Sequence, residues 1–134
     1  MKIKEAAENY LETIYILQNR IGLVRSIDIC NEMGYSKPTI SVVMKEFRND
    51  GYIIMSEEGF ISLTEKGKSI AERIYERHVV IAQALMTLGV AEQTAYADSC
   101  KIEHDISEES FQSIKGWLNA CEKQHGRVDS NPET

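Results

Sequence analysis

The sequence of 134 residues predicts a mainly α-helical protein whose N-terminal half is a winged helix-turn-helix. Three observations predict this fold. Apolar residues recur at helical spacing over most of the chain. Two helix-like segments meet at a glycine-containing turn, and two β-prone runs then surround the polar turn 56–59. The only two prolines, Pro38 and Pro132, leave room for long helices.

The composition is that of an ordinary globular protein, since 43% of the residues are hydrophobic. No apolar run approaches the roughly 18 residues that a membrane span needs, and the N-terminus carries no charged-then-apolar leader. Three cysteines without a close pair argue against a disulfide framework and against a structural zinc knuckle. We therefore expect a soluble, cytoplasmic protein with free thiols.

The net charge of −6 by itself disfavours a nucleic-acid partner, because contacts to phosphates need lysine and arginine. The charge is unevenly distributed, however. Residues 1–80 carry eleven basic and twelve acidic side chains, whereas residues 81–134 carry four basic and nine acidic ones. The acidity therefore lies mainly in the C-terminal part, where it would favour a cation site.

The first helix is expected over residues 4–19, which carry apolar side chains at helical spacing and are followed by Gly22. Asn9 and Glu12 lie three residues apart on a face that is not the main apolar one. Taken alone, two polar residues in these positions are most simply solvated surface residues.

The helix-turn-helix is predicted over residues 26–50. Ser26 is suited to cap a first short helix, and Gly34 is suited to the left-handed conformation that ends it. A second helix then begins with Ser36 as N-cap and an early proline, whose missing N–H costs nothing there. In this arrangement the second helix enters the major groove of DNA. Its candidate DNA-contacting residues are Ser36, Lys37, Pro38, Thr39, Ser41 and Lys45.

The wing is predicted as a hairpin over residues 52–63. Glu57 and Glu58 at its tip would repel phosphates, so we do not expect the tip to hold the DNA backbone. Thr64 is suited to cap the long helix that follows, which holds His78 near its middle. A lone histidine at such a position is more often a hydrogen-bonded structural residue than a metal ligand.

A further helix is expected over residues 90–105, and it carries the stretch Cys100-Lys101-Ile102-Glu103-His104. If this stretch is helical, Cys100, Glu103 and His104 share one face. A thiolate, a carboxylate and an imidazole that converge in this way form a three-point chelate for a first-row divalent metal.

A last helix is expected to begin after the capping residue Ser107. From these elements we expect a winged helix-turn-helix domain at 1–70, a helical domain at 71–124 and a flexible tail at 125–134.

Five segments in register make this chain resemble the diphtheria-toxin-repressor/manganese-regulator (DtxR/MntR) family of metal-dependent transcriptional repressors. The resemblance extends from about Ala6 to Leu118, and any one segment is weakly specific, whereas the five together are specific. The segments are Glu8-Asn9-Tyr10-Leu11-Glu12-Thr13-Ile14-Tyr15, Ser36-Lys37-Pro38-Thr39-Ile40-Ser41, Leu63-Thr64-Glu65-Lys66-Gly67, Arg77-His78 and Cys100-Lys101-Ile102-Glu103-His104.

The resemblance implies a winged helix followed by a helical dimerisation domain, without the SH3-like third domain of the longer iron-type members. It implies a homodimer that binds operator DNA as a repressor of metal-homeostasis genes. The activating metal would be Fe(II) or Mn(II), for which Co, Ni or Zn can substitute, bound where the two domains meet. Carried over by position, the metal ligands are Asn9, Glu12, His78, Cys100, Glu103 and His104.

The implied ligand set is mixed. Glu12 matches the manganese-type pattern, Cys100 matches the iron-type pattern, and Asn9 matches neither. Because Mn²⁺ prefers oxygen ligands whereas thiolate favours Fe²⁺, Co²⁺, Ni²⁺ or Zn²⁺, the set favours iron over manganese. The loss of a carboxylate at Asn9 argues against a two-metal site. The iron type's ancillary second site falls on Ala82 and Tyr96, so that site is not expected either.

These assignments imply a linkage between metal and DNA binding. Glu12 belongs to the DNA-reading half, His78 to the connecting helix, and Cys100 to the dimerisation half. Without metal, repulsion and desolvation of close carboxylates disfavour the compact arrangement. A cation would tie the halves together and set the spacing of two recognition helices for half-sites roughly 34–36 Å apart.

Two other functions stay open. One is a winged-helix regulator that senses an organic ligand or thiol oxidation through Cys100, with Glu103 and His104 as a solvated helix face. The other is an enzyme that uses Cys100 and His104 as a nucleophilic pair, or an open zinc hydrolase site. The sequence offers neither an oxyanion-hole glycine loop nor a substrate-cleft motif, so we do not predict an enzyme.

Overall fold

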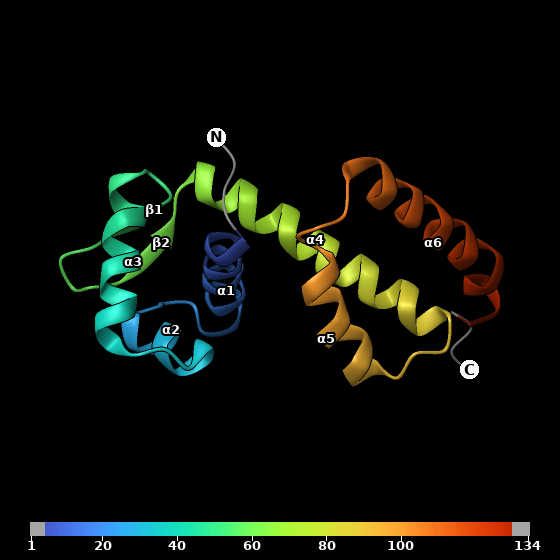
Figure 1. The fold of residues 1–134 in the computed structure, drawn as a ribbon, viewed down its shortest axis with the longest axis horizontal. Coiled ribbons are helices and arrows are strands. Elements are labelled where there is room, and N and C mark those ends of the chain that lie inside the picture. Colours follow the sequence, from blue (N-terminus) through green and yellow to red (C-terminus); the bar gives the residue numbers. More distant parts are fainter. Residues whose placement is uncertain (1–4, 130–134) are drawn as a thin grey trace. The chain divides into compact units, whose positions relative to one another are not determined.

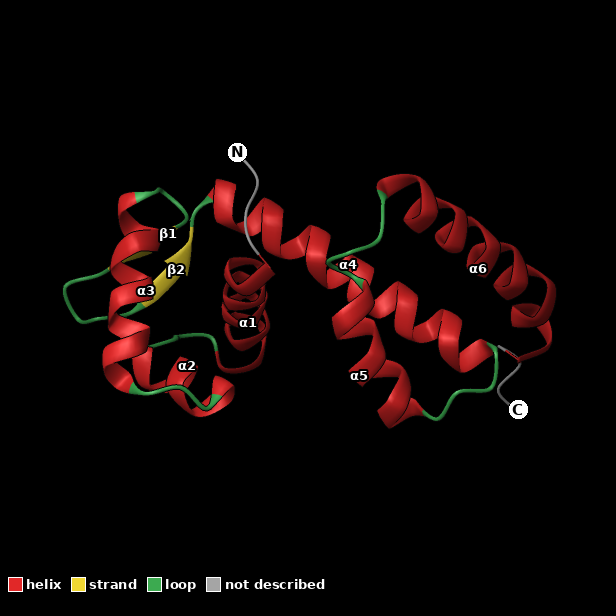
Figure 2. Cartoon of the chain, in the orientation of Figure 1, coloured by secondary structure: helices red, strands yellow, loops and turns green. Residues whose placement is uncertain are grey.

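The structure is a computed structural model that describes the backbone of residues 5–129 and the side chains of residues 5–124 (Figures 1 and 2). Within these residues the chain forms six helices and one two-stranded sheet, which confirms the predicted fold class. It separates into two compact units, Met1–Ile74 and Tyr75–Thr134, and the division falls within the long fourth helix.

The N-terminal unit begins with α1 (Glu5–Ile21), and its helix-turn-helix is formed by α2 (Ser26–Met33) and α3 (Lys37–Asn49). Gly34 follows α2 in the left-handed conformation, with a φ of 74°, and its N–H donates to the Cys30 carbonyl at 2.8 Å. Ser36 caps α3, because its hydroxyl accepts the Thr39 N–H at 3.4 Å. Both helix boundaries lie where the sequence predicts them.

The start of α2 differs from the prediction by one residue. Arg25, not Ser26, is the N-cap, and its N–H donates to the Asp28 carboxylate at 2.9 Å. Arg25 is extended because its neighbour Val24 pairs with the wing, where the Ile61 N–H donates to the Val24 carbonyl at 2.7 Å. Strand pairing therefore sets where this helix begins.

The wing consists of β1 (Ile53–Met55) and β2 (Ile61–Leu63), which pair antiparallel with Ile53 opposite Leu63. Gly59 lies in the turn between them with a φ of 89°. The alternation of buried and exposed residues along each strand turns one face of the hairpin into the core.

The core of the N-terminal unit lies between its helices and the wing. An edge-to-face series of rings links α1 to α3 and to the strand that follows, since the Tyr10–Phe47 and Phe47–Tyr52 centroid distances are 6.0 and 5.8 Å. This packing turns the polar face of α3 outward. The large side chains that are almost completely buried in this core include Leu11, Ile14, Val24, Ile29, Ile40, Met44 and Ile61.

Thr64 connects the wing to α4 (Glu65–Thr87). Its hydroxyl accepts the Gly67 N–H at 3.1 Å and donates to the Gly51 carbonyl at 2.6 Å, so it caps α4 as predicted. Gly67 lies so close to the Tyr52 carbonyl that a Cβ on Gly67 would overlap this backbone oxygen.

The C-terminal unit contains residues 75–87 of α4, together with α5 (Glu92–Ile102) and α6 (Glu108–Asp129). Ser107 caps α6, since its hydroxyl accepts the Ser110 N–H at 3.1 Å. None of the helices in the described part of the chain has the length and apolar character needed to cross a membrane.

Two boundaries in this unit differ from the expected ones. α5 ends at Ile102 rather than near residue 105, because the carbonyls of the next turn bond to the Arg77 side chain. α6 continues as helix through residues 125–129 of the predicted tail. The rest of that tail, residues 130–134, lies outside the residues that the structure describes.

We expect Gly67→Ala to lower the free energy of unfolding by about 1–3 kcal/mol, because the added Cβ would overlap the backbone at Tyr52. Gly116→Ala is the matched control: Gly116 also lies within a helix, and beyond its own stretch of helix no described atom lies within 4 Å of the position that a Cβ would take. There, alanine should raise stability by about 0.5–1 kcal/mol. Urea unfolding followed by circular dichroism measures both, and equal effects would contradict the packing explanation.

Candidate metal centre

Three side chains from neighbouring elements meet in the C-terminal unit. His78 lies on α4, Cys100 in the last turn of α5, and Glu103 directly after that helix. The Nδ1 atom of His78 is 3.2 Å from Glu103 Oε1 and 3.4 Å from Cys100 Sγ. One ligand atom of each residue lies within 4.8 Å of the other two. The structure thus brings a nitrogen, a sulfur and an oxygen donor together.

Glu103 is the most unusual member of this cluster, because it is fully buried, with 0% of its surface exposed. Among the described residues, no donor makes a hydrogen bond to either carboxylate oxygen. His104 Nε2 lies 3.4 Å from Oε2, but neither this contact nor that of His78 counts as a hydrogen bond. A buried carboxylate of this kind is costly unless positive charge compensates it.

The helix face predicted for the ligand stretch includes Cys100 and Glu103 but not His104. Glu103 keeps the helical pattern, since its N–H donates to the Ser99 carbonyl at 3.0 Å. The prediction was wrong for His104, which lies beyond α5 in a turn. Its imidazole nevertheless reaches the cluster, because it approaches one oxygen of Glu103 while His78 approaches the other.

Arg77 supports this turn and was not identified as a site residue from the sequence. It is only 6% exposed, and its guanidinium donates to the carbonyls of Glu103 at 3.1 Å and Ile106 at 2.9 Å. It also donates to the Glu108 carboxylate at 2.8 Å and lies 5.3 Å from the centre of the Phe111 ring. Its only signal in the sequence was its position beside a predicted ligand.

The remaining two predicted ligands, Glu12 and Asn9, lie on α1 of the N-terminal unit. Glu12 is 6% exposed, and Asn9 is half-buried one turn earlier. Glutamate is almost never buried to this extent unless it is paired or binds a metal. Glu12 is therefore not the solvated surface residue that its position alone suggested.

The donors of the C-terminal unit fit a first-row divalent cation. Imidazole, thiolate and carboxylate are all ligands for such ions, and Cys100 is exposed, so solvent reaches the cluster from its side. The positions of the iron type's second site do not repeat this arrangement. Ala82 has no donor atom in its side chain, and the Tyr96 ring packs beside His78 with 5.5 Å between the centroids.

The predicted DNA-contacting residues lie exposed on α3 and at its N-cap. The hydroxyls of Ser36 and Thr39 are hydrogen-bonded to each other at 2.9 Å. Arg48 is also exposed on this helix; the sequence analysis missed it, although it lies only three residues after Lys45. It helps to form a hollow of about 280 Å³ that is lined by Ser26, Ser41, Met44, Lys45, Arg48 and Met55.

Two family models match this chain, and together they cover most of it. One is described as the iron dependent repressor, N-terminal DNA binding domain, at residues 2–59, and the other as the iron dependent repressor, metal binding and dimerisation domain, at residues 64–129. The transcriptional regulator MntR of Salmonella typhimurium is 30% identical over 123 residues, which cover 92% of this chain and 76% of that protein. MntR of Escherichia coli is 30% identical over 112 residues, which cover 84% and 72%. These relatives are transcriptional regulators and not enzymes.

Solved structures share the fold. The manganese regulator SloR matches with a TM-score of 0.73 at 25% identity, covering 89% of this chain and 55% of that one. IdeR of T. acidophilum matches with a TM-score of 0.75 at 21% identity, again covering 89% and 55%. This chain thus spans about half the length of these two. On the evidence of the family models and the relatives, it belongs to the iron-dependent-repressor, or DtxR/MntR, family of metal-dependent transcriptional repressors.

Proposed function

We propose that this chain is a cytoplasmic, homodimeric repressor that binds operator DNA when loaded with Fe(II) or Mn(II) and controls genes of metal homeostasis. The observation that carries the proposal is the Glu103 carboxylate, which is fully buried without a hydrogen bond from any described residue and lies beside two imidazoles and a thiol. The proposed metal ligands are Asn9, Glu12, His78, Cys100, Glu103 and His104.

The chain's own residues account for the linkage between metal and DNA. When bound, the cation supplies positive charge that offsets the burial of the carboxylates. Glu12 lies on α1 of the DNA-binding unit, whereas His78 and Glu103 belong to the C-terminal unit. Ligation by both sets would restrict the motion of one unit against the other. A restricted dimer would hold its two α3 helices at a fixed spacing, which binding to two half-sites requires.

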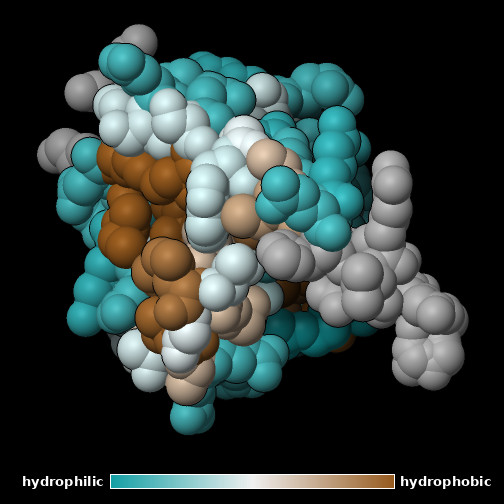
Figure 3. Space-filling model, turned by 90° about the vertical axis from the view of Figure 1, so that its right-hand side faces the viewer, coloured by the Kyte–Doolittle hydropathy of each residue, from teal (hydrophilic) through white to brown (hydrophobic). Residues whose placement is uncertain are grey.

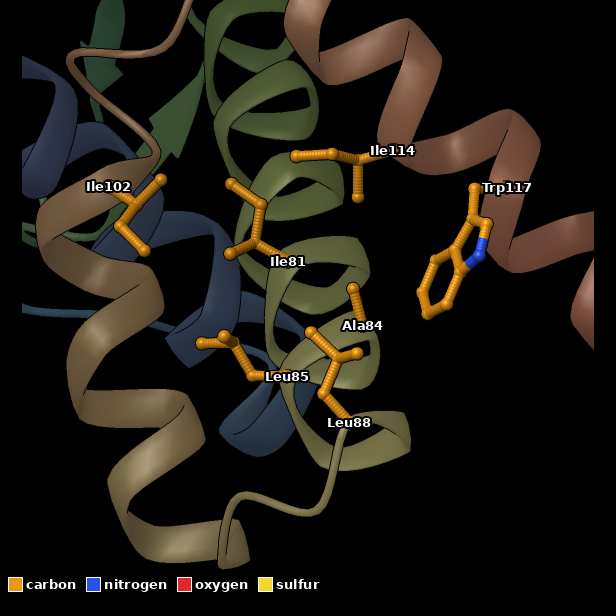
Figure 4. A pocket seen from close by; sticks show the side chains of 7 residues that line it. All are labelled: Ile81, Ala84, Leu85, Leu88, Ile102, Ile114 and Trp117. Carbon is orange, nitrogen blue, oxygen red and sulfur yellow. The ribbon is translucent and has the colours of Figure 1, made fainter.

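An apolar groove in the C-terminal unit supports the homodimer (Figure 4). Side chains from three helices converge on it, and its volume is about 430 Å³. Leu88 and Trp117 at the groove are 70% and 42% exposed, and Figure 3 shows a band of hydrophobic surface on the face it displays. Apolar surface of this kind marks interaction sites, and in the proposed dimer a second copy covers it. The groove is lined by Ile81, Ala84, Leu85, Leu88, Ile102, Ile114 and Trp117.

The surface of α3 supports operator DNA as the partner. Its exposed hydroxyls and cations can bind phosphates and base edges, although the chain as a whole is acidic. The hollow beside Lys45 and Arg48 combines two hydroxyls with two cations, which suits a backbone phosphate. The proposed contacts are Ser36, Lys37, Pro38, Thr39, Ser41 and Lys45.

DNA binding should depend on metal and on the Glu103 carboxylate. A duplex selected from a random library by the Mn²⁺-loaded protein serves as probe, and fluorescence anisotropy measures its affinity. We expect protein treated with a chelator to bind about 5–150-fold more weakly. Glu103→Gln should fold but lose this metal response, because a neutral amide tolerates burial and is a poor ligand.

The control for this prediction is Glu109→Gln, which removes the same charge from an exposed position on α6. Equal DNA binding by wild type with and without metal would contradict the proposed function. If that binding were also abolished by peroxide, the exposed thiol of Cys100 would make the chain a thiol-sensing regulator instead.

Fe²⁺ should activate DNA binding at lower concentration than Mn²⁺ in anaerobic titrations, because the Cys100 thiolate suits the softer ion. Cys100→Asp supplies a carboxylate in its place and should reverse this order, so that Mn²⁺ activates at the lower concentration. Cys121→Ser, on α6, is the thiol-matched control. Wild-type activation by Mn²⁺ at equal or lower concentration would show that the oxygen ligands dominate.

Glu12→Ala should impair activation by metal more than it impairs folding. We expect it to reduce the coupling between metal and DNA binding by roughly 1–3 kcal/mol, because a ligand from the DNA-binding unit is lost. Metal titrations with and without the DNA duplex measure this coupling, and urea unfolding of the apo-protein measures stability. If the variant keeps the wild-type coupling, Glu12 does not take part in the proposed linkage between metal and DNA binding.

A further inference from the structure

The turn that carries two of the proposed ligands, residues 103–106, depends on a side chain from another helix. α5 ends at Ile102 and α6 begins at Glu108, so the carbonyls of Glu103 and Ile106 lie outside both helices. The Arg77 guanidinium bonds to both of these carbonyls, since its Nη1 atom donates to those of Glu103 and Ile106. Each end of the turn is thereby bonded to the same nitrogen of α4.

Arg77 is also fixed from its other side. Its Nη2 atom donates to the Glu108 carboxylate at 2.8 Å, and its guanidinium lies over the Phe111 ring, 5.3 Å from the centroid. Its side chain is 8% exposed, whereas that of Glu108 is 64% exposed. The planar fork of an arginine can serve several acceptors at once, which a lysine ammonium on a flexible stem does less well.

We propose that Arg77 is a positioning residue of the metal centre: it holds the turn 103–106 so that Glu103 and His104 face His78 before any metal binds. The inference rests on the proposed function, because it gives these residues the role of ligands. Arg77 itself does not ligate. Groups that orient metal ligands typically change metal affinity by about 10–100-fold when they are removed.

A purely structural role would give a different result, and the chain offers a matched control. Lys115 on α6 pairs with Glu76 on α4, so it also joins these two helices through one cation. Unlike Arg77, Lys115 makes its side-chain bond to Glu76 and not to the turn that carries the ligands. Lys115→Met therefore removes one positive charge and one contact between α4 and α6, while the bonds from Arg77 to the turn remain.

The test uses Co²⁺ as probe, because its absorption bands report both binding and thiolate ligation. Wild type, Arg77→Met, Arg77→Lys and Lys115→Met are each titrated with Co²⁺ against a competing chelator, and urea unfolding of each apo-protein is measured separately. We expect Arg77→Met to bind Co²⁺ about 10–100-fold more weakly than wild type. Arg77→Lys should rescue only part of this loss, and Lys115→Met should bind within about twofold of wild type.

Three outcomes would overturn the inference when every variant folds. If Arg77→Met loses stability but binds Co²⁺ as tightly as wild type, Arg77 is structural only. If Lys115→Met loses as much Co²⁺ affinity as Arg77→Met, the effect belongs to the contact between helices and not to the turn. If wild type itself fails to bind Co²⁺, the proposed metal centre falls together with this inference. Should Arg77→Met fail to fold, wild-type affinity in Arg77→Lys overturns the inference and weaker binding supports it.

Discussion

The burial of the Glu103 carboxylate is the constraint on which the C-terminal unit depends. Removing a carboxylate from water costs several kcal/mol unless positive charge or hydrogen bonds replace the lost hydration. The protein gives this carboxylate no hydrogen bond from any described residue and instead places an imidazole within 3.4 Å of each oxygen. Burial of this carboxylate is unfavourable when no cation is bound, but it favours the binding of a cation. Family membership and the geometry around Glu103 thus both indicate a metal-dependent regulator.

α4 provides the frame for this arrangement, because it carries two consecutive residues with different roles. Successive side chains on a helix point about 100° apart. His78 therefore faces the donor cluster, while Arg77 faces the turn after α5. Both side chains therefore belong to one continuous helix, which begins after the Thr64 cap beside the wing.

The features that the sequence predicts correctly are those set by local chemistry. Gly34 and Ser36 mark the two ends of the turn between α2 and α3, because a left-handed conformation and an N-cap hydroxyl are properties of single residues. The N-cap at Arg25 and the end of α5 at Ile102 depend instead on pairing with distant segments. Arg77 could not be assigned for the same reason: its acceptors are mostly backbone carbonyls, which every sequence contains.

The same bonds connect the metal centre to the apolar groove. Glu108 and Phe111, which hold the outer side of Arg77, lie on α6, and α6 also contributes Ile114 and Trp117 to the groove. Any movement of α6 on α4 would change the bonds that Arg77 makes, and through them the position of Glu103. Because interiors are close-packed, such a shift cannot be absorbed locally. In the proposed dimer, occupation of the groove would therefore affect the order of the turn 103–106 through the buried Arg77.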